Sequence, residues 1–513
     1  MWYVTKMKTP LDPSLLESLL QEQVEQNKAL RKQLSEQTTL LQQQSILVEN
    51  LQQQIAQLQR MLFGQKSERQ PKASQDNKDA EKQTTTTNKV SRQNSAESQG
   101  NGRRQFPAHL ERVTIIHDLP EQEKHCPCCH SHLKKIGEQT TEQLDFVPAK
   151  LIVNQHVKYK YACKRCQGHI ATAKMPEQPI DKGAAGSGLL AEVLINKYDD
   201  AMPLYRQERR WQRLGYALPR SSLCDWVMQC AERLKPIVDA MVQQCVLTAQ
   251  KIHTDDTTVP ILAKGKTHTG RLWVYRSGGL APPCVVYQYS KTRRKSVPEN
   301  FFKQYKGYIQ ADAYAGYDCL FESNDRIEVG CMAHARRKFT DILNSVPSSA
   351  LTHQAIDYFA QLYQIEKQAK AMTPQQRYYF RRYWAKPILK QFYRWLKTTY
   401  AHAPPKAPLA KAIQYTLNHW QALNNYLRDG ILDIDNNAAE RAIRPLVIGR
   451  KNYLFAGSHQ GAEAAAVIYS LIETCKINGI NSYQYIKSTL EKLPTTLHKD
   501  IHTLFPVNWI PLD

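Results

Sequence analysis

A long polar stretch near the N-terminus divides the chain into parts that must fold separately. Residues 65–105 contain almost no large apolar side chain. Such a segment buries too little apolar surface to offset the entropy that ordering would cost. We therefore expect a disordered, flexible linker here, with one structure before it and others after it. The whole chain has 513 residues, which is too long for one hydrophobic core and indicates several domains.

A seven-residue repeat of apolar side chains precedes the linker and predicts a coiled coil over residues 14–64. We expect this coiled coil to join copies of the chain, which makes the protein a homo-oligomer. The alternative is a single long helix that docks on its own protein. Four core positions are polar, which weakens the seam but can fix its register. The apolar core positions are Leu16, Leu20, Leu30, Leu34, Leu41, Val48, Leu51, Ile55, Leu58 and Leu62.

Two pairs of cysteines mark the next part of the chain, residues 106–180. Cys126 and Cys129 form one Cys-x-x-Cys pair, Cys163 and Cys166 form the other, and strand-like segments lie between them. Two such pairs joined by a hairpin are typical of a tetrahedral site with four thiolate ligands. We predict a small zinc-binding β module in which Zn²⁺ is structural, because no coordination position is left open. The alternative is a small core that contains reduced cysteines.

Residues 183–245 have the apolar spacing of helices, interrupted by the run GYALPR. Two helices with a short glycine turn between them resemble a helix-turn-helix, and Ser221 or Ser222 is expected to cap the second helix. The functional interpretation is contact with DNA phosphates and base edges. A structural helix pair with a solvated basic face explains the pattern equally well. The basic residues concerned are Arg206, Arg209, Arg210, Arg213 and Arg220.

The apolar period then changes to that of strands, in the order KIHTDDTTVPIL, GRLWVYRS, PCVVYQYS, GYIQADAYAGY and RIEVGCM. This order resembles the α/β ribonuclease H-like fold, in which a carboxylate on the first strand lies beside one at the end of the fourth. Asp255 and Asp312 occupy these positions, each where a β-rich run is expected to leave the sheet. We predict this domain at residues 250–478, with a helical insertion at about 345–430 and a C-terminal helical tail at 479–513.

A third carboxylate is expected from a later helix, and Glu440 is the candidate. Asp435 or Asn436 is placed to cap that helix, and Pro445 to stop or kink it. Phosphodiester chemistry needs such a trio because acidic oxygens hold two divalent metal ions. Carboxylate ligands suit Mg²⁺ or Mn²⁺. Taken alone, however, each of these acidic residues is more often a solvated surface charge.

The formal net charge of +22 attracts a polyanion, either nucleic acid or an anionic membrane surface. The sequence has no long apolar segment and no apolar signal core, so we expect neither a membrane span nor secretion. The expected location is the cytoplasm, in association with the nucleoid. Further candidate DNA contacts, each with a solvated surface charge as its alternative, are Arg336, Arg337, Arg444, Arg450 and Lys451. His334 and Lys338 adjoin the first two.

The expected insertion is rich in aromatic and basic residues, as in the run YYFRRYWAKPILKQFYRWLK. In one interpretation, Arg and Lys grip DNA while the aromatic rings stack or pack. We favour the other, in which the rings form the insertion's own core beneath a basic outer face.

Several runs of sequence resemble the transposase family of insertion sequence 66. They are HTDDTTVPIL, YIQADAYAGY, GCMAHARRKF, NNAAERAIRPLVIGRKNYLFAGS and LFPVNWIP, and the paired cysteines and LFGQKSER extend the resemblance to nearly the whole chain except the linker. The resemblance implies an Asp-Asp-Glu transposase that cuts element ends and joins them to target DNA. The family's acidic triad maps onto Asp255, Asp312 and Glu440. The residue after the first Asp is often Glu in similar sequences, so Asp256 is a rival ligand here.

The resemblance also implies partners and leaves two other functions open. The partners are the terminal inverted repeats of the element, target DNA, a second copy of the chain and accessory proteins of the same element. One alternative is a non-catalytic, zinc-containing DNA-binding protein derived from a transposase. The other is a structure-selective nuclease of the same fold, which would cut DNA without joining it.

Overall fold

The computed structural model describes residues 23–37, isolated positions between 40 and 55, residues 150–162 and 170–172, and residues 177–511 except 182 and 324. The chain divides into two compact units, Lys66–Gln155 and all other residues, and the described helices and strands belong to the second. The predicted linker and the four predicted zinc ligands, Cys126, Cys129, Cys163 and Cys166, lie outside the described residues.

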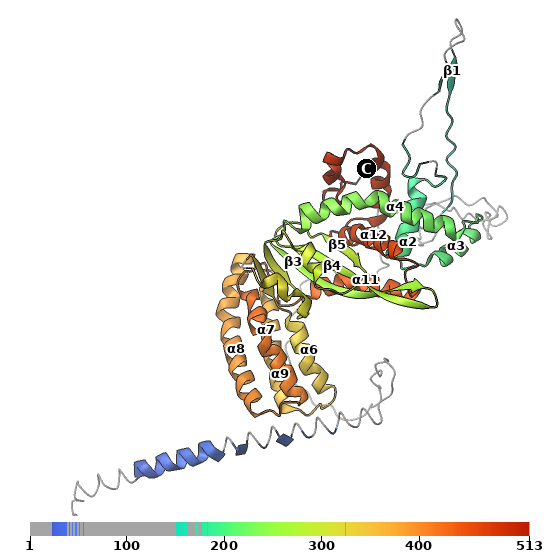
Figure 1. The fold of residues 1–513 in the computed structure, drawn as a ribbon. Helices are drawn as coiled ribbons and strands as arrows, with labels where there is room; N and C mark the ends of the chain where they lie inside the picture. Colours follow the sequence, from blue (N-terminus) through green and yellow to red (C-terminus); the bar gives the residue numbers. More distant parts are fainter. Residues whose placement is uncertain are drawn as a thin grey trace, which may run out of the picture. The chain divides into compact units, whose positions relative to one another are not determined.

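A five-stranded mixed sheet is central to the body of the protein (Figure 1). Its strand order is β5-β4-β3-β6-β7, in which β3, β4 and β5 are antiparallel while β6 and β7 run parallel to β3. The strands are β3 (Lys251–Ala263), β4 (Lys266–Gly278), β5 (Val285–Ser290), β6 (Gly307–Gln310) and β7 (Arg326–Val329).

The central strand β3 is much longer than its parallel neighbour β6. It pairs with β4 along its whole length through a tight turn at Gly265, where φ is +72°. It pairs with β6 only over Lys251–His253. Asp255 therefore does not end a strand, as the sequence had suggested, because β3 continues to Ala263. It lies instead just beyond the point where β6 stops covering β3, which exposes a stretch of β3 beside the loop that follows β6.

Helix α12 (His459–Ile477) protects the antiparallel edge of the sheet. Its Ser470 and Thr474 hydroxyls accept hydrogen bonds from the backbone N–H groups of Tyr287 and Val285, at 2.8 and 3.0 Å. Two hydroxyls four residues apart thus satisfy donors that would otherwise be open to pairing with another chain. Helix α11 (Asn437–Tyr453) packs on β3. The chain between β5 and β6 consists of the short helix α5 (Ser296–Phe301) and the loops on either side of it.

Three helices precede the sheet: α2 (Ser187–Tyr198), α3 (Leu204–Arg213) and α4 (Arg220–Met241), the last followed by the π-helical turn η2 (Val242–Val246). Neither Ser221 nor Ser222 caps α4, because the helix begins earlier, at Arg220. Glu208 of α3 does this instead, since its Oε1 accepts the Arg220 backbone N–H at 3.1 Å. The side chain that accepts this N–H therefore comes from the preceding helix and not from the residues next to the start of α4.

The C-terminal segment folds back on these helices. It contains α13 (Ser482–Lys492) and the 3₁₀ turns η5 (Leu493–Thr495), η6 (His498–Leu504) and η7 (Pro506–Asn508). The Trp509 indole N–H donates to Ser488 at 2.8 Å, which ties the tail to α13. Further upstream, β1 (Lys160–Ala162) and β2 (Ile170–Thr172) form an antiparallel pair around the second predicted cysteine pair.

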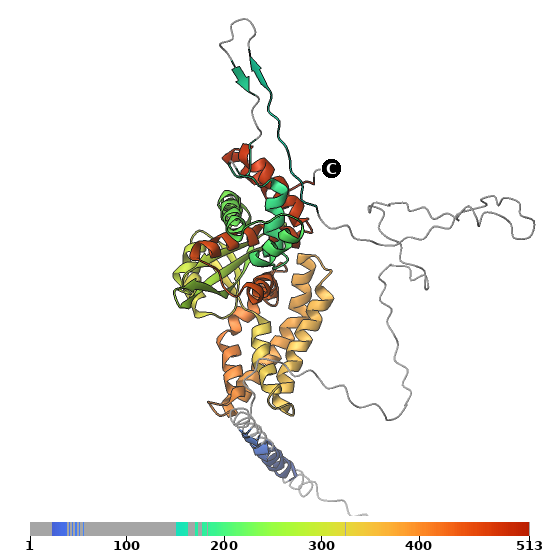
Figure 2. The ribbon, with the colours of Figure 1, turned by 90° about the vertical axis from the view of Figure 1, so that its right-hand side faces the viewer.

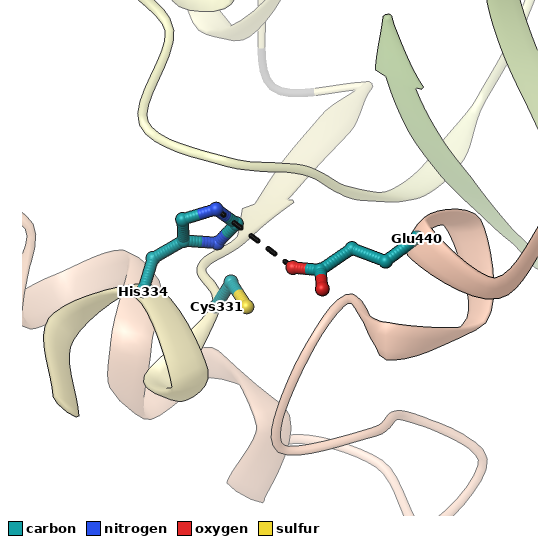
Figure 3. Close-up of side chains that lie close together, drawn as sticks. All are labelled: Cys331, His334 and Glu440. Carbon is teal, nitrogen blue, oxygen red and sulfur yellow. Dashed lines mark ion pairs between the residues drawn. The ribbon is translucent and has the colours of Figure 1, made fainter. Parts of the chain in front are cut away.

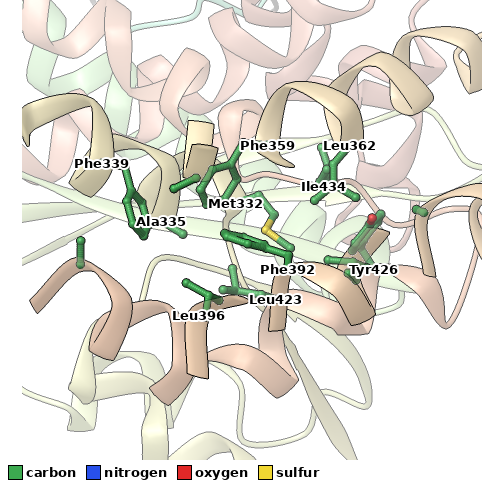
Figure 4. Close-up of a cluster of buried hydrophobic side chains, with 14 of the residues drawn as sticks. Met332, Ala335, Phe339, Phe359, Leu362, Phe392, Leu396, Leu423, Tyr426 and Ile434 are labelled. Carbon is green, nitrogen blue, oxygen red and sulfur yellow. The ribbon is translucent and has the colours of Figure 1, made fainter. Parts of the chain in front are cut away.

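A helical bundle lies between β7 and α11 in the chain and to one side of the sheet (Figures 1 and 2). Its helices are α6 (Met332–Leu343), α7 (Ala350–Ala369), α8 (Pro374–His402), α9 (Pro408–Asn418) and α10 (Trp420–Asn424), and the turn η4 (Asn425–Leu427) follows them. The 3₁₀ helix η3 (Ala315–Phe321) lies earlier in the chain, between β6 and β7. We call this bundle the insertion. It has its own apolar core, in which Phe339, Phe359 and Phe392 are fully buried (Figure 4).

A buried ion pair also stabilises the insertion. Arg381 of α8, whose side chain is 1% exposed, makes two hydrogen bonds to the Glu366 carboxylate of α7, at 2.8 and 2.6 Å. Its Nη1 donates to the carbonyls of Tyr426 and Asp429, so all three guanidinium nitrogens are hydrogen-bonded. Among the described residues, no helix of the protein is long and apolar enough to cross a membrane.

Candidate active site

Helix α11 is fixed to β3 by the residue that precedes it. The Asn436 amide donates to the Thr254 carbonyl at 2.9 Å, and its oxygen lies 3.0 Å from His253 Nδ1. Asn436 holds the N-cap position, but its side chain bonds to β3 and does not cap the helix. Asp435 Oδ1 instead accepts the Asn437 N–H at 3.1 Å. Pro445 lies inside α11 and does not stop it, since the helix continues to Tyr453.

This docking brings Glu440, in the first turn of α11, to the face of β3 that carries Asp255. His253 and Asp255 lie two residues apart on β3 and therefore point to the same face. Asp312 follows the end of β6 by two residues, next to the stretch of β3 that β6 leaves uncovered. Three carboxylates from distant parts of the chain thus converge.

The electrostatics of the three carboxylates reflect their proximity. Burial, followed by the negative charge of Asp312, raises the pKa of Asp255 to about 7, and Glu440 adds to the effect. Burial also raises the pKa of Asp312, although the nearby His334 and Arg293 oppose the shift. Asp255 and Asp312 therefore both resist ionisation, which is the condition that a divalent cation relieves.

Glu440 faces two basic side chains without bonding to either. Its Oε1 lies 3.8 Å from His334 Nε2 (Figure 3) and also 3.8 Å from Arg337 Nη2. This oxygen is shielded from solvent and has no hydrogen-bond partner among the described residues. Ligand atoms of Cys331, His334 and Glu440 all lie within 4.8 Å of one another, which is a spacing that one metal ion can bridge. His334 adjoins two of the predicted DNA contacts in the sequence, and in the structure its imidazole points towards Glu440.

The donors beside Glu440 differ in their readiness to bind a metal. Burial, then the positive charge of Arg337, lowers the pKa of His334, which favours the neutral imidazole that can act as a ligand. Burial raises the pKa of the Cys331 thiol to about 11, so the thiol keeps its proton. Cys331 Sγ also accepts the Asn436 N–H at 3.1 Å. His334 and Glu440 are therefore the more available donors.

Asp256, the rival of Asp255, is fully engaged elsewhere. Its side chain is 1% exposed and forms ion pairs with Arg271 at 2.9 Å and with Arg293 at 2.7 Å. The Arg293 guanidinium in turn lies 3.8 Å from the centre of the Tyr314 ring. Arg293 was missed from sequence, where it stands in an ordinary basic run, TRRK, and nothing marks Asp256 as its partner.

A second ionic cluster lies at the start of β3. Lys251 Nζ is 2.6 Å from Asp433, and His253 Nε2 is 3.0 Å from the same carboxylate. Burial alone would raise the pKa of Asp433, but contacts with His253 and Lys251 outweigh it and hold the pKa well below its usual range. A cavity of about 370 Å³ beside this cluster is lined in part by Arg276 and Arg441. The cavity includes none of the three converging carboxylates, and the cluster joins β3 to the segment that leads into α11.

Comparison with known proteins identifies the family. The family model described as "Transposase IS66 family" matches residues 182–464, which is more than half of the chain and includes all three carboxylates. The chain belongs to the IS66 family of transposases. The resemblance that the sequence motifs suggested is thereby confirmed, and membership implies a transposase role and DNA as the partner.

Three further family models match other parts of this IS66-family chain. The zinc-finger binding domain of transposase IS66 matches residues 123–167, a range that contains both cysteine pairs and supports a structural zinc there. The model described as "Transposase C of IS166 homeodomain" matches residues 50–115, and the IS66 C-terminal element matches residues 470–507.

The relatives include three uncharacterized proteins of Sinorhizobium fredii. The protein y4jD is 32% identical over 79% of this chain and 81% of its own length. The protein y4hP is 32% identical over 79% of this chain and 77% of its own length. For y4qI the identity is 33%, over 80% of this chain and 78% of that protein.

The structure separates the predicted DNA contacts of this family member into two groups. Arg210 pairs with Glu192 at 3.0 Å, and Arg450 donates to Thr258 Oγ1 at 2.9 Å, so both bind their own protein. Arg337 approaches Glu440, as described above. The other predicted contacts are exposed on α3, at the start of α4, on α6 and on α11, and they are Arg206, Arg209, Arg213, Arg220, Arg336, Arg444 and Lys451.

Proposed function

We propose that this chain is a DNA transposase that cleaves the ends of an insertion sequence and joins the 3′ ends to target DNA at one active site. Asp255, Asp312 and Glu440 are its catalytic residues. The observation that carries the proposal is their convergence from β3, from the loop after β6 and from α11, where burial, followed by the charge of Asp312, raises the pKa of Asp255 to about 7. Membership of the IS66 family supplies the reaction class.

The order of the strands supports a ribonuclease H-like fold for the catalytic domain. Three antiparallel strands are followed by two strands parallel to the first, with the first strand central, in the order β5-β4-β3-β6-β7. In this interpretation, Asp255 and Asp312 come from the first and fourth strands of the fold. Glu440 then comes from the helix that follows the insertion.

The residues present suit divalent metal ions. The three carboxylates offer oxygen ligands of the kind that Mg²⁺ and Mn²⁺ prefer, and Glu440 Oε1, which accepts no hydrogen bond from the described residues, is available as a ligand atom. Two such ions, when bound, would activate the attacking oxygen and stabilise the departing one. His334 adds a nitrogen donor on the Glu440 side, which suits Mn²⁺ better than Mg²⁺. Arg293 keeps Asp256 occupied, so this carboxylate does not compete for the ions.

Other parts of the chain would assemble the DNA complex. We assign structural Zn²⁺ to Cys126, Cys129, Cys163 and Cys166. Exposed arginines of α3 and α4 would contact DNA phosphates. The predicted coiled coil would pair two subunits so that two element ends are held together, and accessory proteins of the element would join the complex.

The assay for this proposal combines purified protein, labelled DNA that carries the ends of its own element, a supercoiled target and Mg²⁺. The wild type is expected to yield cleaved ends and joined products, and Asp312→Asn to yield neither. The matched control is Asp325→Asn, because Asp325 is exposed and only forms a surface pair with Lys306 at 3.6 Å. This control should retain activity.

Each alternative function corresponds to a different outcome. Cleavage without any joined product would replace the transposase with a structure-selective nuclease. Binding with no metal-dependent product, the same in wild type and Asp312→Asn, would favour a non-catalytic DNA-binding protein.

The zinc assignment is tested separately by metal analysis. About one Zn²⁺ per chain is expected from a four-thiolate site. The content should fall to near zero in the Cys126→Ser, Cys163→Ser double variant and remain unchanged in Cys224→Ser, which alters an exposed free cysteine. Full zinc content in the double variant would remove the assignment.

A further inference from the structure

Among the described helices and strands, α8 has the largest excess of basic over acidic side chains. Over its whole range, Pro374–His402, it contains seven Lys and Arg and no Asp or Glu. Two of the seven are used inside the insertion. Arg381 pairs with Glu366, and Arg377 donates to the Gly430 carbonyl at 3.0 Å.

The other five cations form a stripe on the surface of α8, and none makes an ion pair within the part of the chain that the structure describes. Their spacing of four, four, four and three residues keeps them on one side of the helix, because an α-helix advances about 100° per residue. At about 1.5 Å of rise per residue, the stripe is roughly 22 Å long. Its members, all exposed, are Arg382, Lys386, Lys390, Arg394 and Lys397.

Aromatic side chains adjoin one end of this stripe. Tyr379 is 61% exposed and Tyr383 is 72% exposed, and each precedes a stripe cation by three residues. Trp384 is 53% exposed, and its ring centre lies 4.9 Å from that of Tyr383. Large rings are costly to leave in water, and beside cations they suit a ligand that combines negative charge with flat or apolar groups.

The position of α8 links the stripe to the active site. The first turns of α6 place His334 and Arg337 beside Glu440, α6 packs on α7, and α7 packs on α8. Figure 1 shows α8 at the outer side of the insertion, and the side chains of the stripe are exposed. DNA that extends from the active site therefore has the insertion as a neighbour.

We propose that the stripe of α8 is a binding surface for the phosphate backbone of duplex DNA, outside the active site. The inference rests on the proposed function for the identity of the polyanion. Five unpaired cations in a row match a row of phosphates, and the absence of any acidic side chain on the helix removes repulsion. The aromatic residues would pack against sugars at the end of the row. The contact is independent of base sequence.

The test measures binding of the full-length protein to a duplex of arbitrary sequence at several salt concentrations, by fluorescence anisotropy and without Mg²⁺. The test variant is the triple substitution Lys386→Gln, Lys390→Gln, Arg394→Gln, which preserves helix propensity. The control, Lys487→Gln, Lys492→Gln, Lys499→Gln, removes the same charge from exposed sites in the C-terminal segment.

If the stripe contacts phosphates, its triple variant should reduce the slope of log affinity against log salt by about 3, or about one per lost contact. The control should leave the slope near that of the wild type. Equal slopes for both variants and the wild type would overturn the proposal. Equal reduction in both would do so as well, since the effect would then be one of net charge.

Two more results separate this inference from other possibilities. If the wild type binds vesicles rich in anionic phospholipid but not the duplex, and the stripe variant loses that binding, the surface is a membrane contact and the proposal fails. The proposed transposase function is tested separately, by the cleavage and joining assay. It fails if the wild type gives no metal-dependent product in that assay, even when the stripe binds DNA. Matching thermal unfolding of the variants and the wild type shows that each protein is folded.

Discussion

Asp255 and Asp256 are neighbours on one strand, yet their environments are opposite. Asp256 is neutralised by two arginines at 2.7 and 2.9 Å. Asp255 faces other carboxylates, and its pKa is raised to about 7 by burial and by Asp312. Strand alternation sends the two side chains to different faces, so one sequence pair produces one carboxylate that is ion-paired and one whose ionisation is opposed by burial and by Asp312.

The first prediction concerns Asp255 and the pH dependence of stability without metal. The unfolded chain ionises this carboxyl near 3.8, whereas the folded chain holds its proton to about 7. The folded state binds more protons between these values, so this group's contribution to stability falls as pH rises from about 4 to about 7. The loss is at most about 4 kcal/mol.

The measurement is denaturant unfolding at pH 5 and pH 8 in the presence of a chelator. Asp255→Asn should lose less stability across this range than the wild type, while Asp325→Asn should follow the wild type. Added Mn²⁺ should restore stability at pH 8 in the wild type and in Asp325→Asn but not in Asp255→Asn, because the metal replaces the proton. Parallel curves for wild type and Asp255→Asn would contradict the prediction.

The second prediction is that Asp256, unlike Asp255, stabilises the fold through its arginine partners and does not bind the metal. Asp256→Asn removes a buried partner from Arg271 and Arg293, whose side chains are 24% and 36% exposed. Their partial exposure lets water compensate, so we expect a loss of about 2 kcal/mol, less than for a fully buried pair. Mn²⁺ binding, measured by calorimetry on the folded variant, should survive in Asp256→Asn and be abolished in Asp255→Asn. Loss of Mn²⁺ binding in both would make Asp256 a ligand.

At the scale of elements, α7 and α8 depend on an ion pair that is almost fully buried. We predict that Glu366→Ala lowers the free energy of unfolding of the insertion by about 3 to 5 kcal/mol, because it leaves the Arg381 charge buried without its partner. The fluorescence of Trp384, Trp395 and Trp420 reports unfolding of this part of the chain. Lys367→Ala, at the exposed neighbouring position, should change the midpoint little. An unchanged midpoint in Glu366→Ala would show that the pair contributes nothing.

The elements also show what the sequence could and could not provide. Alternating and continuous apolar runs predicted strands around Asp255 and Asp312, because burial is periodic along a strand. The run KIHTDDTTVPIL covered nearly all of β3, but the expectation that Asp255 ends a strand was wrong, because pairing with β4 continues past it to Ala263. The cap of α4 was missed for a related reason, because Glu208 reaches it from another helix.

Pairings between residues distant in the sequence were the part of the site that the sequence predicted least well. Glu440 meets His334 and Arg337, and Asp256 meets Arg293, only after the chain has folded. Local spacing carries no information about such partners. The candidate carboxylates themselves were found because motif runs around them resemble a family, whereas spacing alone left each one indistinguishable from a surface charge.

The whole molecule must hold two DNA ends if it is a transposase, which requires two copies of the chain. The N-terminal repeat is the proposed means. In the described helical residues 23–37, Leu30 is 68% exposed and Leu34 is 67% exposed. Exposed leucines at core positions of a seven-residue repeat gain burial when a second helix covers them, at about 25 cal/mol for each Å² of apolar surface.

We therefore predict that Leu30→Asp, Leu34→Asp converts the protein to a monomer, as measured by light scattering after gel filtration. The control is Lys28→Asp, Lys32→Asp, which places two aspartates at outward positions of the same helix and should leave the dimer intact. In the leucine variant, affinity for a single short duplex should change little, because the body of the protein carries those contacts. Complexes that hold two ends should be lost, since each subunit then acts alone. A monomeric wild type, or a dimer that survives both leucine substitutions, would return the repeat to its alternative, a helix that docks on its own protein.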